Sequence, residues 1–168
     1  DFEIPKLVIN IPPRHMKSLS VSVFWPTWEW THSPEMRYLF ASYADTLSTR
    51  DSLKCRNIIQ SAWYKERWGE VFYLVGDQNQ KTRFENNKRG YRIATSVGGS
   101  ATGEGGDRLV ADDPHKVDEA ESDTIRQGVI DWWDGTMTTR GNDPKTVAQV
   151  IVMQRLHEQD LTGHLLEQ

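Results

Sequence analysis

The chain has 168 residues, 37% of them hydrophobic and 26% charged, which predicts one domain with a buried core and excludes two ordinary domains. A formal net charge of −4 argues against a surface that grips nucleic acid all over, and the single cysteine excludes an internal disulfide. No apolar run reaches the roughly 18 residues that span a bilayer, and no leader pattern opens the chain. We therefore expect a soluble, cytoplasmic protein, and the start at Asp1 suggests an excised piece of a longer one.

Strand and helix signals alternate along the chain. Residues 6–11 are a short apolar run stopped by Pro12-Pro13, which predicts a buried strand feeding a loop. A helix is expected over 18–30, with Pro26 kinking or ending it. The other predicted strands are 37–43, 71–75, 92–97, 109–111 and 148–153, and the other predicted helices are 45–61, 122–133 and a closing helix capped by Asp160.

This alternation predicts the fold class. Strands that alternate with helices form a mostly parallel α/β sheet covered by helices on both faces. The polar stretch 78–91, with its Asn-Asn and Arg-Gly turns, predicts together with 92–97 a hairpin inserted in the alternation.

Polar clusters fall where three predicted strands end. The loop 11–18 has the Lys-Ser ending of a phosphate loop, in which Lys17 reaches the outer phosphates of ATP and Ser18 ligates Mg²⁺. Asp112 and Asp113 follow a second strand, where one carboxylate can lie beside the metal and the other can orient an attacking water. Gln154 and Arg155 follow a third strand. Because ligands of open parallel sheets bind at the carboxyl ends of strands, the three clusters predict one ATP site.

The loop departs from the usual phosphate-loop pattern. Ile11 and Met16 stand where that pattern has its first glycine and the glycine before the lysine. An ordinary strand-to-helix turn with a solvated lysine is the alternative interpretation, and the other two clusters favour the phosphate loop.

Several separated strings form an ordered set: Pro-Pro-Arg-His-Met-Lys-Ser at 12–18, Ala-Ser-Tyr at 41–43, Thr-Gly-Glu-Gly-Gly-Asp at 102–107, Asp-Asp-Pro at 112–114 and Gln-Arg-Leu-His-Glu-Gln-Asp-Leu-Thr-Gly at 154–163. This set resembles the large subunit of tailed-bacteriophage terminases over nearly the whole chain. The resemblance implies a P-loop NTPase of the additional-strand, RecA-like type, which hydrolyses ATP to drive double-stranded viral DNA through a portal into a procapsid. It implies that 1–168 is a single ATPase domain, with the adenine-binding segment and the nuclease domain lying outside it.

The resemblance also implies partners and a location. They are double-stranded DNA, the portal protein, the small terminase subunit and other copies in a homo-oligomeric ring, with no membrane. The protein would work in the host cytoplasm, docked transiently on the procapsid portal, and would be absent from the mature virion.

The resemblance assigns roles residue by residue. Asp112 resembles the acid that organises Mg²⁺ and Asp113 the catalytic carboxylate, a place more often held by Glu. Arg14 resembles an arginine that senses the γ-phosphate. Gln154 resembles a sensor that couples hydrolysis to motion, with Arg155 beside it, and both are expected to face the nucleotide. The implied ATP-binding segment is Pro13, Arg14, His15, Met16, Lys17, Ser18 and Leu19.

One departure concerns an arginine supplied in trans. Many terminases carry it in the glycine-rich loop, here 98–107, but Glu104 stands at that place. Arg108, Arg92 and Arg140 are the candidates to act in trans, unless Arg14 alone meets the phosphate charge in cis.

Two alternatives to a packaging motor remain from the residues. One is another RecA-like nucleic-acid motor of the helicase type, which the 154–163 string argues against. The other, motivated by Met16 and Asp113, is a degenerate nucleotide site that serves as an assembly or DNA-binding module without turnover.

Overall fold

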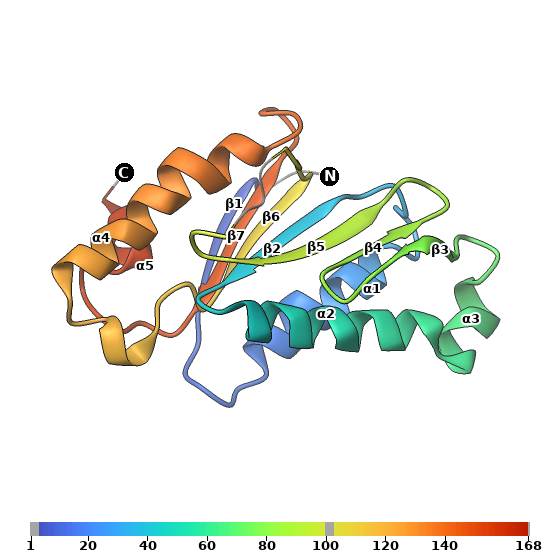
Figure 1. Cartoon of the computed structure of the whole chain (residues 1–168), viewed down its shortest axis with the longest axis horizontal. Helices are drawn as coiled ribbons and strands as arrows, with labels where there is room; N and C mark the ends of the chain where they lie inside the picture. Colours follow the sequence, from blue (N-terminus) through green and yellow to red (C-terminus); the bar gives the residue numbers. More distant parts are fainter. Residues whose placement is uncertain (1–3, 100–102, 168) are drawn as a thin grey trace.

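The computed structural model describes residues 4–99 and 103–167, so Thr102 of the 102–107 string and part of the glycine-rich loop lie outside the described residues. A seven-stranded sheet runs through the domain in the order β1-β7-β6-β2-β5-β4-β3 (Figure 1). The strands are β1 (Lys6–Asn10), β2 (Tyr38–Ser42), β3 (Leu74–Asn79), β4 (Arg83–Asn86), β5 (Tyr91–Ser96), β6 (Arg108–Asp112) and β7 (Ala148–Met153). Among the described residues, no helix has the length and apolar character needed to cross a membrane.

Helices cover both faces of the sheet, as the sequence predicts. They are α1 (Trp25–Glu29), α2 (Asp45–Gln60), α3 (Ala62–Trp68), α4 (Asp123–Trp132) and α5 (Leu161–Leu166), with π-helical turns at Leu19–Phe24 and Trp133–Met137 and short 3₁₀ turns at Val117–Glu119 and Thr138–Arg140. In Figure 1, α4 and α5 lie on one side of the sheet, and α1 and α2 lie on the other.

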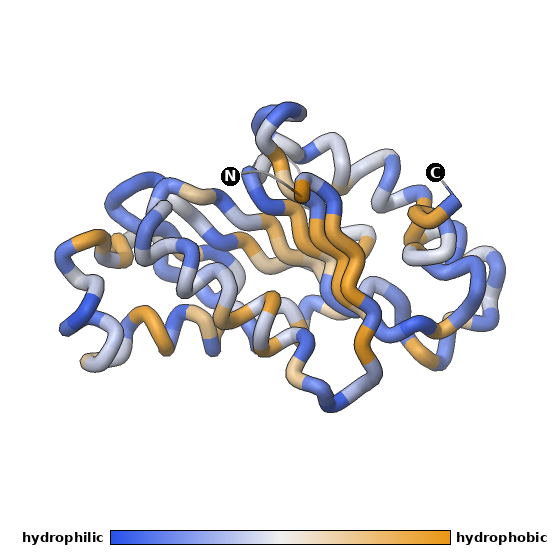
Figure 2. Tube along the Cα trace, turned by 180° about the vertical axis from the view of Figure 1, so that it is seen from behind, coloured by the Kyte–Doolittle hydropathy of each residue, from blue (hydrophilic) through white to orange (hydrophobic). Residues whose placement is uncertain are grey.

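β1 precedes the first polar cluster and β6 carries the second. The two strands are not neighbours in the sheet, and both pair with β7, the last strand of the chain. β7 lies between β1 and β6 and pairs in parallel with both, with Asn10 opposite Met153 and Asp112 opposite Val152. The carboxyl ends of these three strands therefore meet at one edge of the sheet. Figure 2 shows the same strands as hydrophobic through their middle, with hydrophilic loops at their ends.

The predicted hairpin is part of the main sheet and not a separate insertion. β5 pairs in parallel with β2, while β4 and β3 add antiparallel strands at the far edge. The predicted strand 71–75 is wrong in its bounds, because β3 begins at Leu74 and runs into the polar residues up to Asn79. An edge strand needs less apolar sequence than a central one, so hydropathy alone places its bounds poorly.

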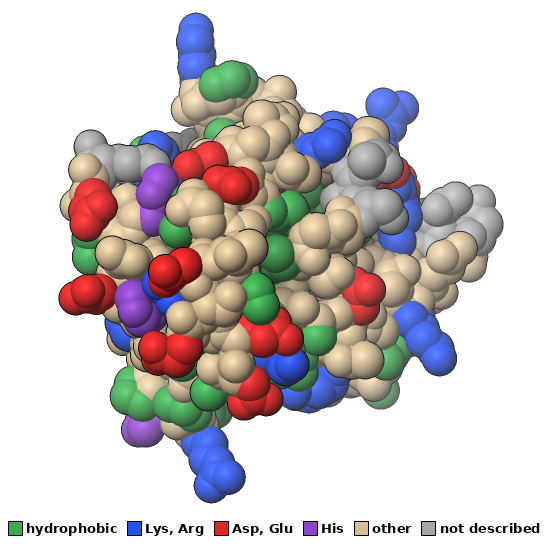
Figure 3. Space-filling view, turned by 60° about the vertical axis from the view of Figure 1, so that its left-hand side comes forward, with side chains coloured by type: hydrophobic (Ala, Val, Ile, Leu, Met, Phe, Trp, Pro, Cys, Tyr) green, Lys and Arg blue, Asp and Glu red, His purple; other side chains and the backbone are tan. Residues whose placement is uncertain are grey.

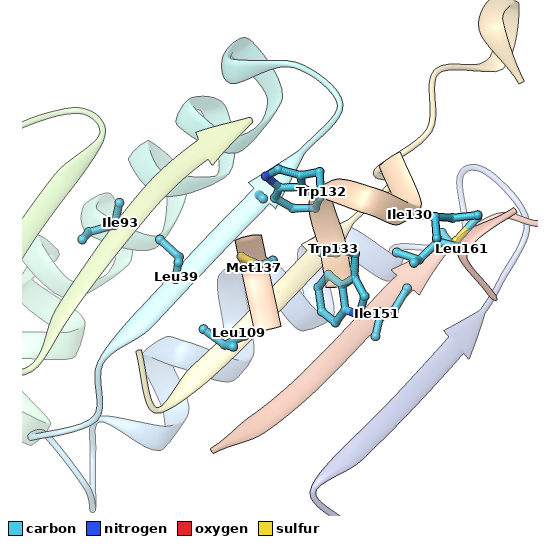
Figure 4. Packing of buried hydrophobic residues seen from close by; sticks show 12 residues of the cluster. Leu39, Ile93, Leu109, Ile130, Trp132, Trp133, Met137, Ile151 and Leu161 are labelled. Atoms are coloured by element: carbon cyan, nitrogen blue, oxygen red, sulfur yellow. The ribbon is translucent and has the colours of Figure 1, made fainter. Parts of the chain in front are cut away.

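Alternate residues of the central strands point to opposite faces and build two apolar clusters. Leu39 and Ala41 face α4, in a cluster with Trp133 and Met137 (Figure 4). Tyr38 and Phe40 face the other way, in a cluster with Val23, Trp30, Cys55 and Ile59 from the opposite helical layer. A sheet buried on both sides explains why these strands read as continuous apolar runs.

The helix after the candidate phosphate loop does not end at Pro26. A π-helical turn covers Leu19–Phe24 and passes directly into α1, so Pro26 lies in the first turn of the α-helical part. Pro26 lacks the N–H that would donate to the Ser22 carbonyl four residues earlier, and Nη2 of Arg92 donates to that carbonyl instead, at 3.1 Å. At the end of α1, Glu29 is buried against Arg108 and Tyr38, with Nε of Arg108 donating to Oε1 of Glu29 at 3.1 Å and the Tyr38 hydroxyl also donating to this carboxylate.

Candidate functional site

The structure brings the three predicted polar clusters together. The loop after β1 carries Lys17 and Ser18, the end of β6 carries Asp112 and Asp113, and Gln154 follows β7. Parallel pairing of these strands places all of them at the carboxyl edge of the sheet, at the lower end of β1, β7 and β6 in Figure 1. This is the edge at which open α/β sheets bind ligands.

The loop 11–16 keeps a glycine-like backbone without glycine. Arg14 has φ 66° and Met16 has φ 60°, both in the left-handed region. The conformation costs an L-residue about 1–2 kcal/mol, and Met16 adopts it where the usual phosphate loop has glycine. Pro13, Arg14, His15 and Met16 are exposed, whereas Lys17 is only 8% exposed at the start of the helix. The loop therefore places four exposed residues directly before a buried lysine.

Asp112 is a buried carboxylate held by hydroxyl groups. Ser18 Oγ donates to its Oδ1 at 3.0 Å, and Ser22 Oγ, one turn further along the π-helical segment, donates to its Oδ2 at 2.6 Å. Burial, helped by the neighbouring Asp113 charge, raises the pKa of Asp112 from 3.8 to about 6, although the two serine hydrogen bonds act to lower it. Within the described part of the chain its carboxylate forms no ion pair.

These donors fit Mg²⁺. A hydroxyl and a buried carboxylate are the hard oxygen ligands that Mg²⁺ takes, and Mg²⁺ usually keeps waters and substrate phosphates as its other ligands. The described residues contain no group of three or more His, Cys, Asp or Glu side chains that could hold a metal by themselves. The residues thus suit a metal that arrives with a nucleotide, held by Ser18 and Asp112.

Asp113 is held in a fixed position next to the lysine. Its Oδ2 lies 2.8 Å from Nζ of Lys17, and its backbone is left-handed at φ 47°. The N–H of Asp113 donates to the Val152 carbonyl at 2.9 Å, and the N–H of Gln154 donates to Oδ1 of Asp113 at 3.2 Å. Strand β7 therefore sets the orientation of this carboxylate from two sides.

A cavity of about 210 Å³ opens in front of these groups. It contains residues to which the sequence assigned no role, namely Arg50 and Asp51 of α2, Ser42 at the end of β2, and His115. Ser42 Oγ donates to the carbonyl of Asp112 at 2.6 Å, and Nε2 of His115 accepts the N–H of Leu161 at 2.9 Å. The one sequence signal for Arg50 is its place on a helix that begins directly after the end of a predicted strand.

Three predicted arginines point away from this cavity. Arg155 was expected to face the nucleotide, but its Nε lies 3.0 Å from the buried carboxylate of Asp160, and its Nη2 donates to two carbonyls of the same turn. Arg92 was a candidate to act in trans, but it is fully buried, with its guanidinium carbon 4.2 Å from the centre of the Phe40 ring. Arg108 is bound to Glu29 at the opposite end of β6. Both Arg92 and Arg108 are therefore buried within the domain, and their trans role stays a prediction.

The remaining predicted residues lie near the surface or at the rim. Arg140 lies near the amino edge of the sheet, where its carbonyl accepts the N–H of Gly106. Arg14 is exposed on the loop, and Leu19 starts the π-helical turn and packs against the cluster around Trp30. The roles of Arg14 and Arg140 stay predictions.

Comparison with known proteins gives a match in structure but none in sequence. No protein-family model matches the chain, and no curated protein matches it in sequence. Among solved structures, the crystal structure of the HK97 bacteriophage large terminase is similar with a TM-score of 0.68 over 97% of this chain, at 12% sequence identity. The chain covers 32% of the length of that terminase. At such low identity the likeness concerns the fold, and this mixed α/β domain with its mostly parallel seven-stranded sheet therefore has a terminase-like fold.

Proposed function

We propose that the chain is a nucleotide-hydrolysing motor domain that converts ATP to ADP and phosphate and drives double-stranded viral DNA into a procapsid. The observation that supports this proposal is the meeting of Lys17, Ser18, Asp112 and Asp113 at the carboxyl edge of the sheet. Lysine, hydroxyl and adjacent carboxylates are the groups that phosphoryl transfer to water needs.

The proposed chemistry begins with an exchange of partners. Lys17 leaves Asp113 for the outer phosphates, where its charge offsets the charge that develops on the γ-phosphoryl oxygens. Ser18 and Asp112 would hold Mg²⁺, which when bound polarises the phosphate oxygens. Asp113, freed of Lys17 but still fixed by the Gln154 N–H, then orients a water for in-line attack.

A second candidate function follows from the Lys17–Asp113 ion pair itself. A carboxylate 2.8 Å from an ammonium group is a poor partner for water while that contact persists. If ATP binding does not break the contact, the domain binds nucleotide without turnover and acts as an assembly or DNA-binding module.

The partners proposed for the motor are DNA, the portal protein, the small terminase subunit and further copies of the chain in a ring. The surface around α4 and α5 gathers acidic side chains (Figure 3), and its exposed members include Asp118, Glu121, Asp123, Asp131, Asp134 and Glu158. These charges repel the phosphate backbone, so the DNA-facing surface is proposed to lie elsewhere on the domain.

Calorimetric titration with Mg²⁺ and ATP, followed by a phosphate-release assay, tests the proposal. The parent should bind and hydrolyse ATP, and Lys17→Ala should do neither. Asp113→Asn should bind but not hydrolyse. Lys145→Ala, an exposed lysine in the turn before β7 at the other edge of the sheet, is the matched control and should behave as the parent. Binding without phosphate release by the parent would support the second candidate, and binding that survives in Lys17→Ala would refute the site.

A further inference from the structure

Arg50 lies on α2 and lines the same cavity as Ser18, Asp112, Asp113 and Gln154. Its side chain is half exposed, at 50%. Of the described residues that line this cavity, it is the sole arginine, and none is a lysine. The guanidinium of Arg50 and the carboxylates of Asp112 and Asp113 thus border one cavity of about 210 Å³, which is large enough for a phosphate group.

Asp51, the partner of Arg50, has a second cation beside it. Nε and Nη2 of Arg50 donate to the two oxygens of Asp51 at 3.0 and 2.9 Å. Asp51 is buried, but Nζ of Lys54 also donates to its Oδ1, at 3.1 Å. Burial acts to raise the pKa of Asp51, yet the hydrogen bonds from Arg50 and Lys54 outweigh it and leave the pKa lowered. Because Lys54 stays in place, Asp51 keeps a cation when Arg50 turns toward a ligand.

The chemistry of the guanidinium selects the ligand. A planar fork of N–H donors matches two oxygens of one phosphate group, and such bidentate pairs are among the stronger polar contacts in proteins. Ser18, which follows Lys17 at the phosphate loop, and Arg50 of α2 both line this cavity, and they come from different elements. A phosphate group held beside Ser18 would thus share the cavity with Arg50.

We propose that Arg50 binds the terminal phosphoryl group of the nucleotide in cis, and so distinguishes a nucleoside triphosphate from a diphosphate. The inference rests on the proposed nucleotide site and adds a residue to it. It gives the chain a γ-phosphate contact from its own α2, separate from Arg14 on the exposed loop.

The test compares the affinities of a non-hydrolysable ATP analogue, AMP-PNP, and of ADP, each with Mg²⁺, by calorimetry. Arg50→Ala should weaken AMP-PNP binding roughly 10- to 100-fold, as expected for a lost charged hydrogen-bond pair, and leave ADP affinity within about twofold. Arg50→Lys keeps the charge but not the fork, so its AMP-PNP affinity should fall between those of the parent and Arg50→Ala. Arg56→Ala is the matched control, because Arg56 lies on the same helix and bonds to Asn79 away from the cavity.

The outcomes separate this inference from the proposed function. If the parent binds neither nucleotide, the proposed function fails and the inference fails with it. If the parent binds both nucleotides and Lys17→Ala binds neither, the site stands. In that case, an Arg50→Ala variant that changes both affinities equally, or neither, overturns the inference alone, as does a preference for AMP-PNP that disappears in Arg14→Ala instead. Thermal melting in EDTA checks that each variant is folded.

Discussion

Asp112→Asn should stabilise the nucleotide-free domain while removing its proposed metal ligand. Burial raises the pKa of Asp112 from 3.8 to about 6, a rise of about two units. Each unit corresponds to about 1.4 kcal/mol, so keeping this carboxylate ionised in the folded chain costs about 3 kcal/mol. The asparagine does not ionise, and its amide can still bond to the hydroxyls of Ser18 and Ser22.

The sign of the pH dependence follows from the direction of the shift. A carboxyl whose pKa is raised on folding favours the folded state fully below its unfolded pKa of 3.8, and that contribution is lost as the pH rises through about 6. The advantage of Asp112→Asn should therefore be about 3 kcal/mol at pH 8 and fall below about 1 kcal/mol at pH 4.

Urea denaturation in EDTA at several pH values measures this difference. Asp118→Asn is the matched control, because Asp118 is exposed on the segment that follows β6, and its effect should be small at every pH. An Asp112→Asn variant that is less stable than the parent at pH 8, or an advantage that does not change with pH, would refute the reasoning.

Three further results are expected from equilibrium denaturation. Met16 has φ 60°, a conformation that a β-branched residue tolerates least, so Met16→Val should lower the free energy of unfolding by about 1 kcal/mol. Met16→Gly should not lower it. Equal stability of the parent and both variants would contradict the assigned backbone. Glu29→Leu should lower the free energy of unfolding by about 3–5 kcal/mol, because it leaves Arg108 buried without its carboxylate. Adding Arg108→Leu should restore a large part of that stability, which a double-mutant cycle measures. Strictly additive effects of the two substitutions would count against coupling between them. Asp160→Ala should cost about 1–2 kcal/mol, because the Asp160 side chain caps α5 through the N–H of Gly163, and an unchanged midpoint would show that this cap is dispensable.

The sequence predicts which polar clusters meet at one edge of the sheet, because the backbone determines that outcome. Lys17, Asp112 and Gln154 each follow an apolar run, and parallel pairing then places all strand ends at one edge. The direction of long side chains is a different matter. Arg155 is next to Gln154 in sequence, but the cap of α5 offers it a buried carboxylate and two carbonyls, which no local pattern shows.

The sequence also does not predict which arginine side chains are buried or border the cavity. Arg92 ends the basic stretch 81–92, which predicts either a hairpin that faces DNA or another subunit or a solvated face. In the structure β5 lies next to β2, and the Arg92 guanidinium lies over the Phe40 ring. Arg50 gives no local sequence signal for a different reason: Asp51 and Lys54, three residues apart on an amphipathic helix, have the spacing of a surface ion pair, and Arg50 is one more charged residue beside them. Only the packing of α2 beside the strand ends shows that Arg50 and Asp51 border the cavity.

The central place of β7 has a consequence for how the domain is made. β1, with its loop, and β6, with its carboxylates, touch no common strand except β7, which comes near the end of the chain. During synthesis from the N-terminus, these two groups therefore stay apart until residues 148–153 insert between them. Such pairing between distant parts of the chain is slow compared with helix formation. A nascent or truncated chain that lacks β7 would hold both halves of the site without joining them, so nucleotide binding would report completion of the sheet.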